Sequence, residues 1–421
     1  MRMIGTAIVI HLSLAAVTSA QPKPPEPKKI QFGINPDGIT SPPMREALTK
    51  MQEAGVMAGR RGSLTFFRWA DGKPPRLAHL GLWGPKVGND VLALTAALPD
   101  LEHVSLYETN VDDTGFQVLA KLPKLRSLAV TPIIRYEKEA FGPPQWSYPF
   151  MPKRDDRPRI TGKSLAILSK SQGLESLDLL DVRLASADLE TLAAWPKLST
   201  IALPNPIDAE TVKYLQVCRK LTVLTLGHRE ITTGELEHLA AWKSLRKLTL
   251  IHARLSDEAL LTLAKLETVE ELHLTDCGLT DDRLRHLQAS PKLTTLILDR
   301  NEIDGPGLMH LTGLKLTSLS LPFNNITNKT LVHLTPLTTL DTLGISYCLG
   351  VTDEGIRGGT LQKMTHLKRL NLRGLKQVTD ASLDDLVKFG HLDHVTIRET
   401  KISLDGVSRM QKAMPKTIVF K

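Results

Sequence analysis

The chain has 421 residues, of which 42% are hydrophobic and only 5% aromatic. Its length suggests two or three globular domains, unless the chain is built from repeats, in which case length counts repeats. The formal net charge is +8 at pH 7, yet acidic and basic residues are interspersed, with no block of five or more like charges. This distribution argues against a nucleic-acid-binding arm or a polybasic membrane patch, and we expect no nucleic-acid partner.

Residues 1–20 have the pattern of a signal peptide. Arg2 precedes an apolar run from Met3 to about Ala16, and Thr18-Ser19-Ala20 forms a small-residue cleavage site. The run is too short for a membrane span, which needs about 20 apolar residues. An uncleaved anchor and a disordered tail stay open as alternatives. Because no later segment is long and apolar enough to span a membrane, we expect an extracytoplasmic protein, either periplasmic or secreted.

Two short regions precede the repeats. Residues 21–45, which include QPKPPEPKK, are rich in Pro and Lys and predict an exposed linker. Residues 46–76 open with a helical pattern, EALTKMQEAGVMAG, and continue with SLTFFRWADGKP. Phe66, Phe67 and Trp69 cluster there, and we expect this region to cap the open end of a repeat core.

From residue 77 to residue 421 one motif recurs, L-x-x-L-x-L followed by a loop, an aliphatic residue and a helical segment. Most of its spacings are 23 to 25 residues, which is too short for ankyrin or tetratricopeptide arrays. The motif begins at Leu77, Leu101, Leu125, Leu174, Leu198, Leu221, Leu245, Val269, Leu293, Leu316, Leu340, Leu367 and Leu392. A terminal strand at residues 418–420 would close the array.

Residues 245–266 show how one unit is expected to fold. Leu245, Leu248 and Leu250 share the inward side of a short strand and its entry turn. Leu255 then turns into the core, and the later leucines follow helical spacing. Ser256 and the acids after it suit a helix N-terminus. The same start recurs at Thr280, Thr352 and Thr379.

These units resemble leucine-rich repeats of the ribonuclease-inhibitor-like and cysteine-containing kind. Their loop position is held by Cys277, Asn301, Asn324 and Cys348, and residues 343–356, LGISYCLGVTDEGI, are especially similar to the cysteine-containing subtype. The resemblance covers about residues 77–420 and looks like an exported bacterial type. It implies an α/β leucine-rich-repeat solenoid that is curved, with parallel strands on the concave face and helices on the convex face. No F-box-like segment precedes the repeats.

The three cysteines are expected to be free thiols. Cys277 and Cys348 lie three repeats apart, so stacked strands would separate them by about 15 Å. A disulfide tolerates about 7 Å at most. Cys218 falls in the outer segment of another repeat, and no catalytic signature surrounds any of the three.

The step from Leu125 to Leu174 equals about one repeat plus an insertion at about residues 131–159. This insertion carries Trp146, Tyr148 and Phe150 among its aromatic residues. Long loops are often functional and aromatic residues dominate binding hot spots, so these three side chains are candidates for a clamp on a ligand. The loop could equally fold back and seal the flank of the solenoid.

One outward position, two residues after the last aliphatic of each strand, forms a column across the predicted concave face. It reads Asp181, Asn205, His228, His252, Asp276, Arg300, Phe323 and Tyr347, and its members from His228 onward are candidate binding residues. His228, His252 and Asp276, with His273 nearby, could converge on a divalent metal. We expect instead a solvated polar ladder that holds no metal.

The predicted function is a non-enzymatic, exported binding module that recognises a protein or peptide on the concave face. The chain contains no G-x-S-x-G, H-E-x-x-H or G-x-x-x-x-G-K-S/T motif, so we expect no catalytic residue and no cofactor. A carbohydrate-binding or cell-wall adhesin is an alternative, in which Trp83, Tyr107, Phe323 and Tyr347 would offer stacking platforms. A metal-dependent hydrolase centred on His228 and His252 is a further alternative.

Overall fold

The structure is a computed structural model that describes residues 42–53, 64–67, 76–107, 109–131, 160–180, 182, 184–204, 207–227 and 230–421. The chain divides into two compact units. Unit 1 comprises Met1–Asn205 and Lys213–Leu221, and unit 2 comprises Pro206–Val212 and Thr222–Lys421. The chain passes between the units at three points, after Asn205, after Val212 and after Leu221, and the second of these lies within helix α5 (Ala209–Val217).

Unit 1 contains a sheet with the strand order β1-β2-β3-β4-β5-β6. Strand β1 pairs antiparallel with β2, and the later neighbours pair in parallel. Its elements are α1 (Pro42–Glu53), β1 (Leu64–Phe67), β2 (Arg76–Trp83), α2 (Asn89–Ala93), η2 (Leu94–Ala97), β3 (His103–Tyr107), η3 (Asp113–Gly115), α3 (Phe116–Leu119), β4 (Ser127–Thr131), α4 (Gly162–Leu168), β5 (Ser176–Asp178), η4 (Ser186–Ala194) and β6 (Thr200–Leu203).

Helix α1 begins at Pro42, inside the segment expected to be a linker, since proline is well tolerated in the first turn of a helix. Leu48 and Met51 of α1 are fully buried, and the helix packs against η2 of the first repeat. Trp69 and the predicted signal peptide lie outside the described residues.

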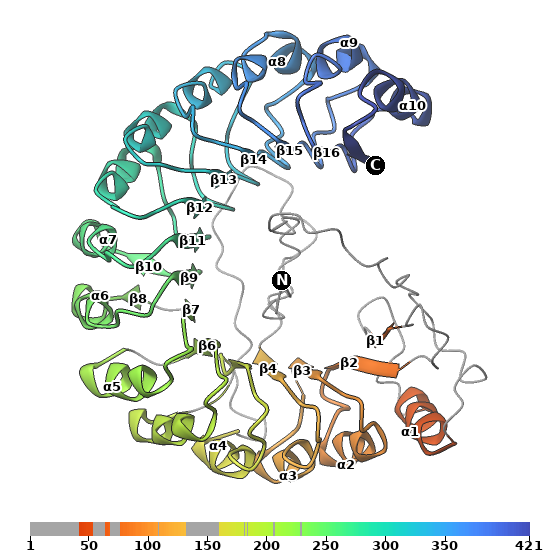
Figure 1. Ribbon diagram of the computed structural model, residues 1–421, viewed down its shortest axis with the longest axis vertical. Coiled ribbons are helices and arrows are strands. Elements are labelled where there is room, and N and C mark those ends of the chain that lie inside the picture. The colour runs from red at the N-terminus through yellow and green to blue at the C-terminus, as the bar shows by residue number, and fades with distance from the viewer. Residues whose placement is uncertain are drawn as a thin grey trace. The chain divides into compact units, whose positions relative to one another are not determined.

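Unit 2 contains a parallel sheet with the strand order β7-β9-β11-β12-β13-β14-β15-β16-β17 and a small parallel pair, β8 and β10. Its strands lie on the inner side of an arc and its helices on the outer side (Figure 1). The elements are β7 (Val223–Gly227), β8 (Glu230–Ile231), α6 (Thr233–Ala240), β9 (Lys247–Ile251), β10 (Arg254–Leu255), α7 (Asp257–Ala264), β11 (Glu271–Thr275), η5 (Asp281–Leu287), β12 (Thr295–Ile297), η6 (Pro306–Leu311), β13 (Ser318–Ser320), η7 (Leu331–Leu334), β14 (Thr342–Gly344), α8 (Asp353–Arg357), η8 (Leu361–Lys363), β15 (Arg369–Asn371), η9 (Asp380–Ser382), α9 (Leu383–Leu386), β16 (His394–Thr396), α10 (Leu404–Ala413) and β17 (Ile418–Phe420).

The strand register follows the leucine motif. Leu248 pairs with Leu272, Leu272 with Leu296, and each later strand repeats this match. The inward leucines therefore stack on one another along the unit, and Leu248 and Leu250 are fully buried. The same inward position is buried throughout the described repeats, which confirms an α/β leucine-rich-repeat solenoid. Strand β17 ends the sheet as predicted.

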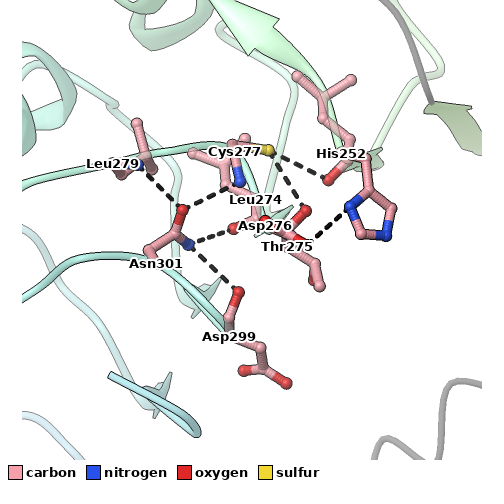
Figure 2. Close-up of polar contacts among 9 residues, drawn as sticks. His252, Leu274, Thr275, Asp276, Cys277, Leu279, Asp299 and Asn301 are labelled. Carbon is pink, nitrogen blue, oxygen red and sulfur yellow. Dashed lines mark hydrogen bonds and ion pairs between the residues drawn. The ribbon is translucent and has the colours of Figure 1, made fainter. Parts of the chain in front are cut away.

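Buried asparagines lie beside the leucines, and Figure 2 shows the contacts of one of them, Asn301. The side-chain oxygen of Asn301 accepts hydrogen bonds from the backbone N–H groups of Cys277 and Leu279, both at 3.0 Å. Its amide nitrogen donates to the carbonyls of Leu274 at 2.7 Å and Leu298 at 2.9 Å. Backbone N–H and carbonyl groups in the turn after the strand, which have no partner in the sheet, are thereby hydrogen-bonded inside the core.

All three cysteines are buried free thiols, as predicted. The Sγ of Cys277 and that of Cys348 occupy the same place as the asparagine side chains and contact carbonyls of the preceding repeat. Burial raises the pKa of Cys277 and of Cys348 to about 12, so both thiols stay protonated at neutral pH.

The predicted helix starts are confirmed at Ser256, Thr352 and Thr379, whose side chains accept hydrogen bonds from backbone N–H groups of the first turn. Thr280 is the exception, because its side chain makes no such bond. The aspartate that follows it, Asp281, instead accepts from the backbone N–H of Asp304 in the next repeat, at 2.8 Å. Side chains at the start of a helix can therefore also hydrogen-bond to the neighbouring repeat.

The repeats on either side of the predicted insertion are direct neighbours, since β4 pairs in parallel with β5. The 49-residue step therefore holds a single repeat with added chain, as expected. Residues 132–159 lie outside the described residues, and so do Trp146, Tyr148 and Phe150. Among the residues described, no helix combines the length and apolar character required to cross a membrane.

Candidate functional site: a side-chain ladder on unit 2

Seven consecutive repeats of unit 2 place one residue each in the left-handed region of backbone conformation, with φ between 49° and 75°. We call this row the ladder. Its members are His252, Asp276, Arg300, Phe323, Tyr347, Gly374 and Glu399. The first five belong to the column predicted from the sequence. Gly374 and Glu399 extend it and were missed, although they too stand two residues after an inward aliphatic, Leu372 and Ile397.

The left-handed turn extends the pattern of interstrand hydrogen bonds. The N–H of each ladder residue donates to the carbonyl just before the next ladder residue, as from Arg300 to Pro322 at 2.9 Å and from Tyr347 to Arg373 at 2.8 Å. Glycine adopts this conformation freely, whereas other L-residues lose about 1–2 kcal/mol in it. Phe323 and Tyr347, at φ of 57° and 56°, are bulky residues in a strained position.

His252 and Asp276 form the first rungs. Their Nδ1 and Oδ2 atoms lie 2.7 Å apart, and His252 is buried while Asp276 is partly exposed (Figure 2). His228, the candidate next to them, lies outside the described residues. The part of the chain that the structure describes holds no group of three or more His, Cys, Asp or Glu side chains arranged for a metal ion.

His273, proposed from the sequence to lie near that pair, is on strand β11. Burial, together with the charge of Lys247, lowers the pKa of His273 to about 3. The ring is therefore neutral at physiological pH and contributes no charge to the strand face.

Arg300, Phe323 and Tyr347 form the middle of the ladder. The guanidinium of Arg300 lies 4.0 Å from the centroid of the Phe323 ring. On the other side of Phe323 the ring of Tyr347 stacks at 4.4 Å, with an angle of 7° between the planes. Both faces of the Phe323 ring are therefore covered by the neighbouring repeats.

Gly374 makes room for Tyr347. A Cβ atom at residue 374 would lie 2.3 Å from the nearest carbon of the Tyr347 ring, so any larger residue would displace the tyrosine. The second face of Tyr347 thus rests on backbone, while its first face contacts Phe323. The tyrosine spans the repeat that lacks a side chain and reaches the one beyond.

Glu399 is the last rung. It accepts hydrogen bonds from the hydroxyl of Tyr347 at 2.7 Å and from Nε of Arg373 at 3.0 Å. The Tyr347 hydroxyl and then the Arg373 guanidinium hold the pKa of Glu399 below its usual value. The pKa of Tyr347 is raised, first by burial and then by its bond to Glu399. The cluster therefore keeps Tyr347 protonated and Glu399 ionised.

Beside the ladder lies a buried carboxyl, Asp299, which is 7% exposed. Its Oδ1 accepts a hydrogen bond from the Ser320 hydroxyl at 2.8 Å. Burial raises the pKa of Asp299 to about 7 despite this bond. The carboxyl is thus partly protonated near neutral pH, and it offsets the positive charge of Arg300 only in part.

The structure brings together five of the candidate binding residues, His252 to Tyr347, in one continuous row. It places Tyr107 differently from the stacking platform we considered, because this residue is 5% exposed. The side chain of Trp83 lies outside the described residues.

No known family model matches the chain, and no curated protein matches it. Solved structures to which it is similar include an internalin from Listeria monocytogenes, with 17% identity and a TM-score of 0.40 over 90% of this chain and 97% of that one. TLR13 in its complex with ssRNA13 has 18% identity and a TM-score of 0.44 over 82% of this chain and 53% of that one. An LRR protein from Leptospira interrogans has 16% identity and a TM-score of 0.32 over 78% of this chain and 92% of that one. Such distant likenesses carry no argument about function.

Proposed function

We propose that the protein is a non-enzymatic binding module that takes a protein or peptide ligand on the ladder of unit 2. The strained backbone carries this proposal. Six ladder residues other than glycine hold a left-handed conformation, at about 1–2 kcal/mol each. A fold under no further demand would use Gly or Asn there, and such strain clusters at functional sites.

The composition of the ladder also favours a macromolecular ligand. Arg and Tyr are enriched at hot spots of protein interfaces, and both lie in its middle. The side chains hold one another through stacking and hydrogen bonds before any ligand arrives. A ligand would therefore lose little of its binding free energy to the ordering of flexible side chains.

The same geometry weakens the adhesin alternative. A sugar stacks on an open aromatic face, but Phe323 has Arg300 and Tyr347 on its two faces. Tyr347 in turn has Phe323 and the Gly374 backbone, and Tyr107 is buried. The hydrolase alternative depends on His228, which lies outside the described residues.

The test is capture of ligands from the native host by wild type and by the double variant Phe323→Gly/Tyr347→Gly. Glycine relaxes the left-handed backbone, which offsets the loss of stacking, so the variant should melt close to wild type. The matched control is Met309→Ala/Val332→Ala, which changes two exposed side chains on the helical side. We expect wild type and the control variant to retain ligands that the ladder variant loses. Equal capture by all three proteins would refute the proposal.

We further propose that the protein acts outside the cytoplasm and that the insertion assists binding. The apolar run and the Thr18-Ser19-Ala20 site support export, as does the likeness to an exported type of cysteine-containing repeat. N-terminal sequencing from the native host should find cleavage after Ala20.

For the insertion, Trp146→Ala should weaken ligand binding and leave the melting temperature unchanged. A melting shift with unchanged affinity would assign the loop a sealing role.

A further inference from the structure

The sheet face beside the ladder carries a buried carboxyl group, that of Asp299. Its side chain lies on the side of its backbone opposite Asn301 (Figure 2) and is 7% exposed. One hydrogen bond reaches it from another residue, the bond from the Ser320 hydroxyl to Oδ1. It forms no ion pair with any residue that the structure describes. Buried carboxylates are nearly always paired with a cation, and Asp299 departs from this rule.

The carboxyl destabilises the fold where an uncharged residue would not. Burial raises the pKa of Asp299 to about 7, and the Ser320 hydrogen bond and the charge of Arg300 oppose only part of this shift. The equivalent positions of the two adjacent repeats are uncharged, with Thr275 before it and Pro322 after it. The fold itself therefore does not require an acid at this position. Buried titratable groups of this kind gather at functional sites.

The surroundings of Asp299 suit a primary ammonium group as its partner. A guanidinium binds best through two parallel hydrogen bonds to both carboxylate oxygens, but Oδ1 already accepts one from Ser320. An ammonium is a compact charge that needs only one carboxylate oxygen and can give its other N–H groups to nearby oxygens. A metal ion would need more ligands, and the described residues hold no group of three or more His, Cys, Asp or Glu side chains arranged for one.

The ladder favours a lysine side chain as the source of this ammonium. The N–H of Arg300 donates to the carbonyl of Pro322 at 2.9 Å, so Phe323 and Asp299 belong to adjacent repeats. Phe323 is partly exposed, and stacking on Tyr347 holds its ring in place. The four methylenes of a lysine pack on apolar surface while the charged end reaches a polar group. An amino group at a chain terminus has no such stem with which to reach a buried carboxyl.

From these observations we infer that the ligand of the ladder presents a lysine, whose ammonium group pairs with Asp299 while its alkyl stem lies against Phe323. This inference rests on the proposed function and makes Asp299 the residue that selects the ligand. The ligand would supply the cation that a buried carboxylate requires. Asp299 would then lower the stability of the free protein and contribute to the stability of the complex, as residues at binding sites often do.

The charged groups around Asp299 make the binding depend on pH. Arg300 acts on the carboxyl from the same repeat. The preceding repeats contribute His273, which is neutral, and the pair that His252 and Asp276 form at 2.7 Å. The side chains at this place in the following repeat are uncharged. Burial is thus the main cause of the raised pKa, and an ammonium that binds the ionised form should displace a proton.

Fluorescence polarisation with labelled peptides tests the inference. Three peptides have an acetylated amino terminus and a Gly/Ser background, with lysine, norleucine or arginine at the central position. A fourth peptide has a free amino terminus and no lysine. At pH 8 we expect the lysine peptide to bind at least about tenfold more tightly than the norleucine peptide and the free-terminus peptide. It should also bind more tightly than the arginine peptide.

The pH profile provides a second readout. Lysine keeps its charge between pH 6 and pH 8, since its pKa is about 10.4. Asp299, with a pKa of about 7, is mostly ionised at pH 8 and mostly protonated at pH 6. The affinity for the lysine peptide should therefore fall about tenfold from pH 8 to pH 6, in proportion to the ionised fraction. The norleucine peptide should show no such change.

Variants assign both effects to one carboxyl. Asp299→Asn should abolish the preference for lysine and its pH dependence, and it should melt no lower than wild type at pH 8, so that unfolding does not explain the loss. The matched control is Asp282→Asn, which makes the same change on the exposed helical side in η5 and should bind like wild type.

Several results would overturn the inference. These are no binding of the lysine peptide, equal binding of the lysine and norleucine peptides, tighter binding of the arginine peptide, or an unchanged lysine preference in Asp299→Asn. If one of them occurs while native ligands still depend on Phe323 and Tyr347, the proposed function stands and only the lysine ligand is wrong. If native ligands no longer depend on these two residues, the proposed function itself is refuted.

Discussion

Replacing Asn301 by alanine should destabilise unit 2 far more than replacing a cysteine at the equivalent position. The asparagine oxygen is the partner of two buried N–H groups, those of Cys277 and Leu279. Its amide nitrogen also donates to three backbone carbonyls, those of Leu274, Leu298 and Asp299. A buried donor left without a partner costs about 1–3 kcal/mol. The carbonyls keep a second lone pair, so the two N–H groups dominate, and we expect a loss of about 4 kcal/mol in the free energy of unfolding.

The comparison is Cys277→Ala. The Cys277 thiol makes only long contacts, 3.6 Å to the Leu250 carbonyl and 3.5 Å to the Thr275 carbonyl. Its removal should cost about 1–2 kcal/mol, mainly through lost packing. Urea unfolding of wild type and both variants, followed by circular dichroism at one pH, measures the two losses. If Asn301→Ala costs no more than Cys277→Ala, the hydrogen-bond accounting at this turn is wrong.

Three more predictions concern unit 2 and the thiols. The pKa of Asp299 is about 7 in the folded protein and near 3.8 in the unfolded chain. Between these pH values the native state holds a proton that the unfolded chain releases. The free energy of unfolding should therefore fall by up to about 4 kcal/mol as the pH rises from 3.8 to 7. Asp299→Asn should remove this loss, raising the melting temperature at pH 8 but not at pH 4, and an equal effect at both would contradict the burial of a protonated carboxyl. The three cysteines should resist a thiol reagent in the native protein at pH 8 and all react after unfolding; fewer than three after unfolding would mean that two are oxidised. Leu248→Asp should lower the melting temperature sharply because it places an unpaired charge in the core, and wild-type melting would refute its inward position.

The fold could be predicted from the sequence because its signal is periodic. Leucines at L-x-x-L-x-L positions recur often enough to fix the inward side of every strand, and the structure buries Leu248 and its equivalents as expected. The distance between Cys277 and Cys348 followed from the same register. The type of helix could not be predicted from the sequence. Outer segments such as η5 and η6 are 3₁₀ helices of six or seven residues, and runs this short carry too little pattern to separate them from α-helices.

The candidate site was only half accessible to sequence reasoning. The column from His252 to Tyr347 could be counted from the motif, but its left-handed backbone could not, because glycine or asparagine is the usual sign of that conformation. The predicted column ends at Tyr347 and omits Gly374, which allows Tyr347 to reach Glu399. The packing of the side chains decides which ring faces are exposed, and the spacing of residues in the sequence does not determine this packing.

Photo-crosslinking in the native host tests most directly whether the ladder is where a ligand binds. A benzophenone amino acid replaces Phe323 in one protein and Met309, which is 59% exposed on helix η6, in another. Both positions belong to unit 2, so expression and stability of the two proteins can be matched. We expect light to produce a discrete crosslinked species at position 323 that position 309 does not give. Crosslinking at position 309 alone, or the same products at both positions, would contradict it.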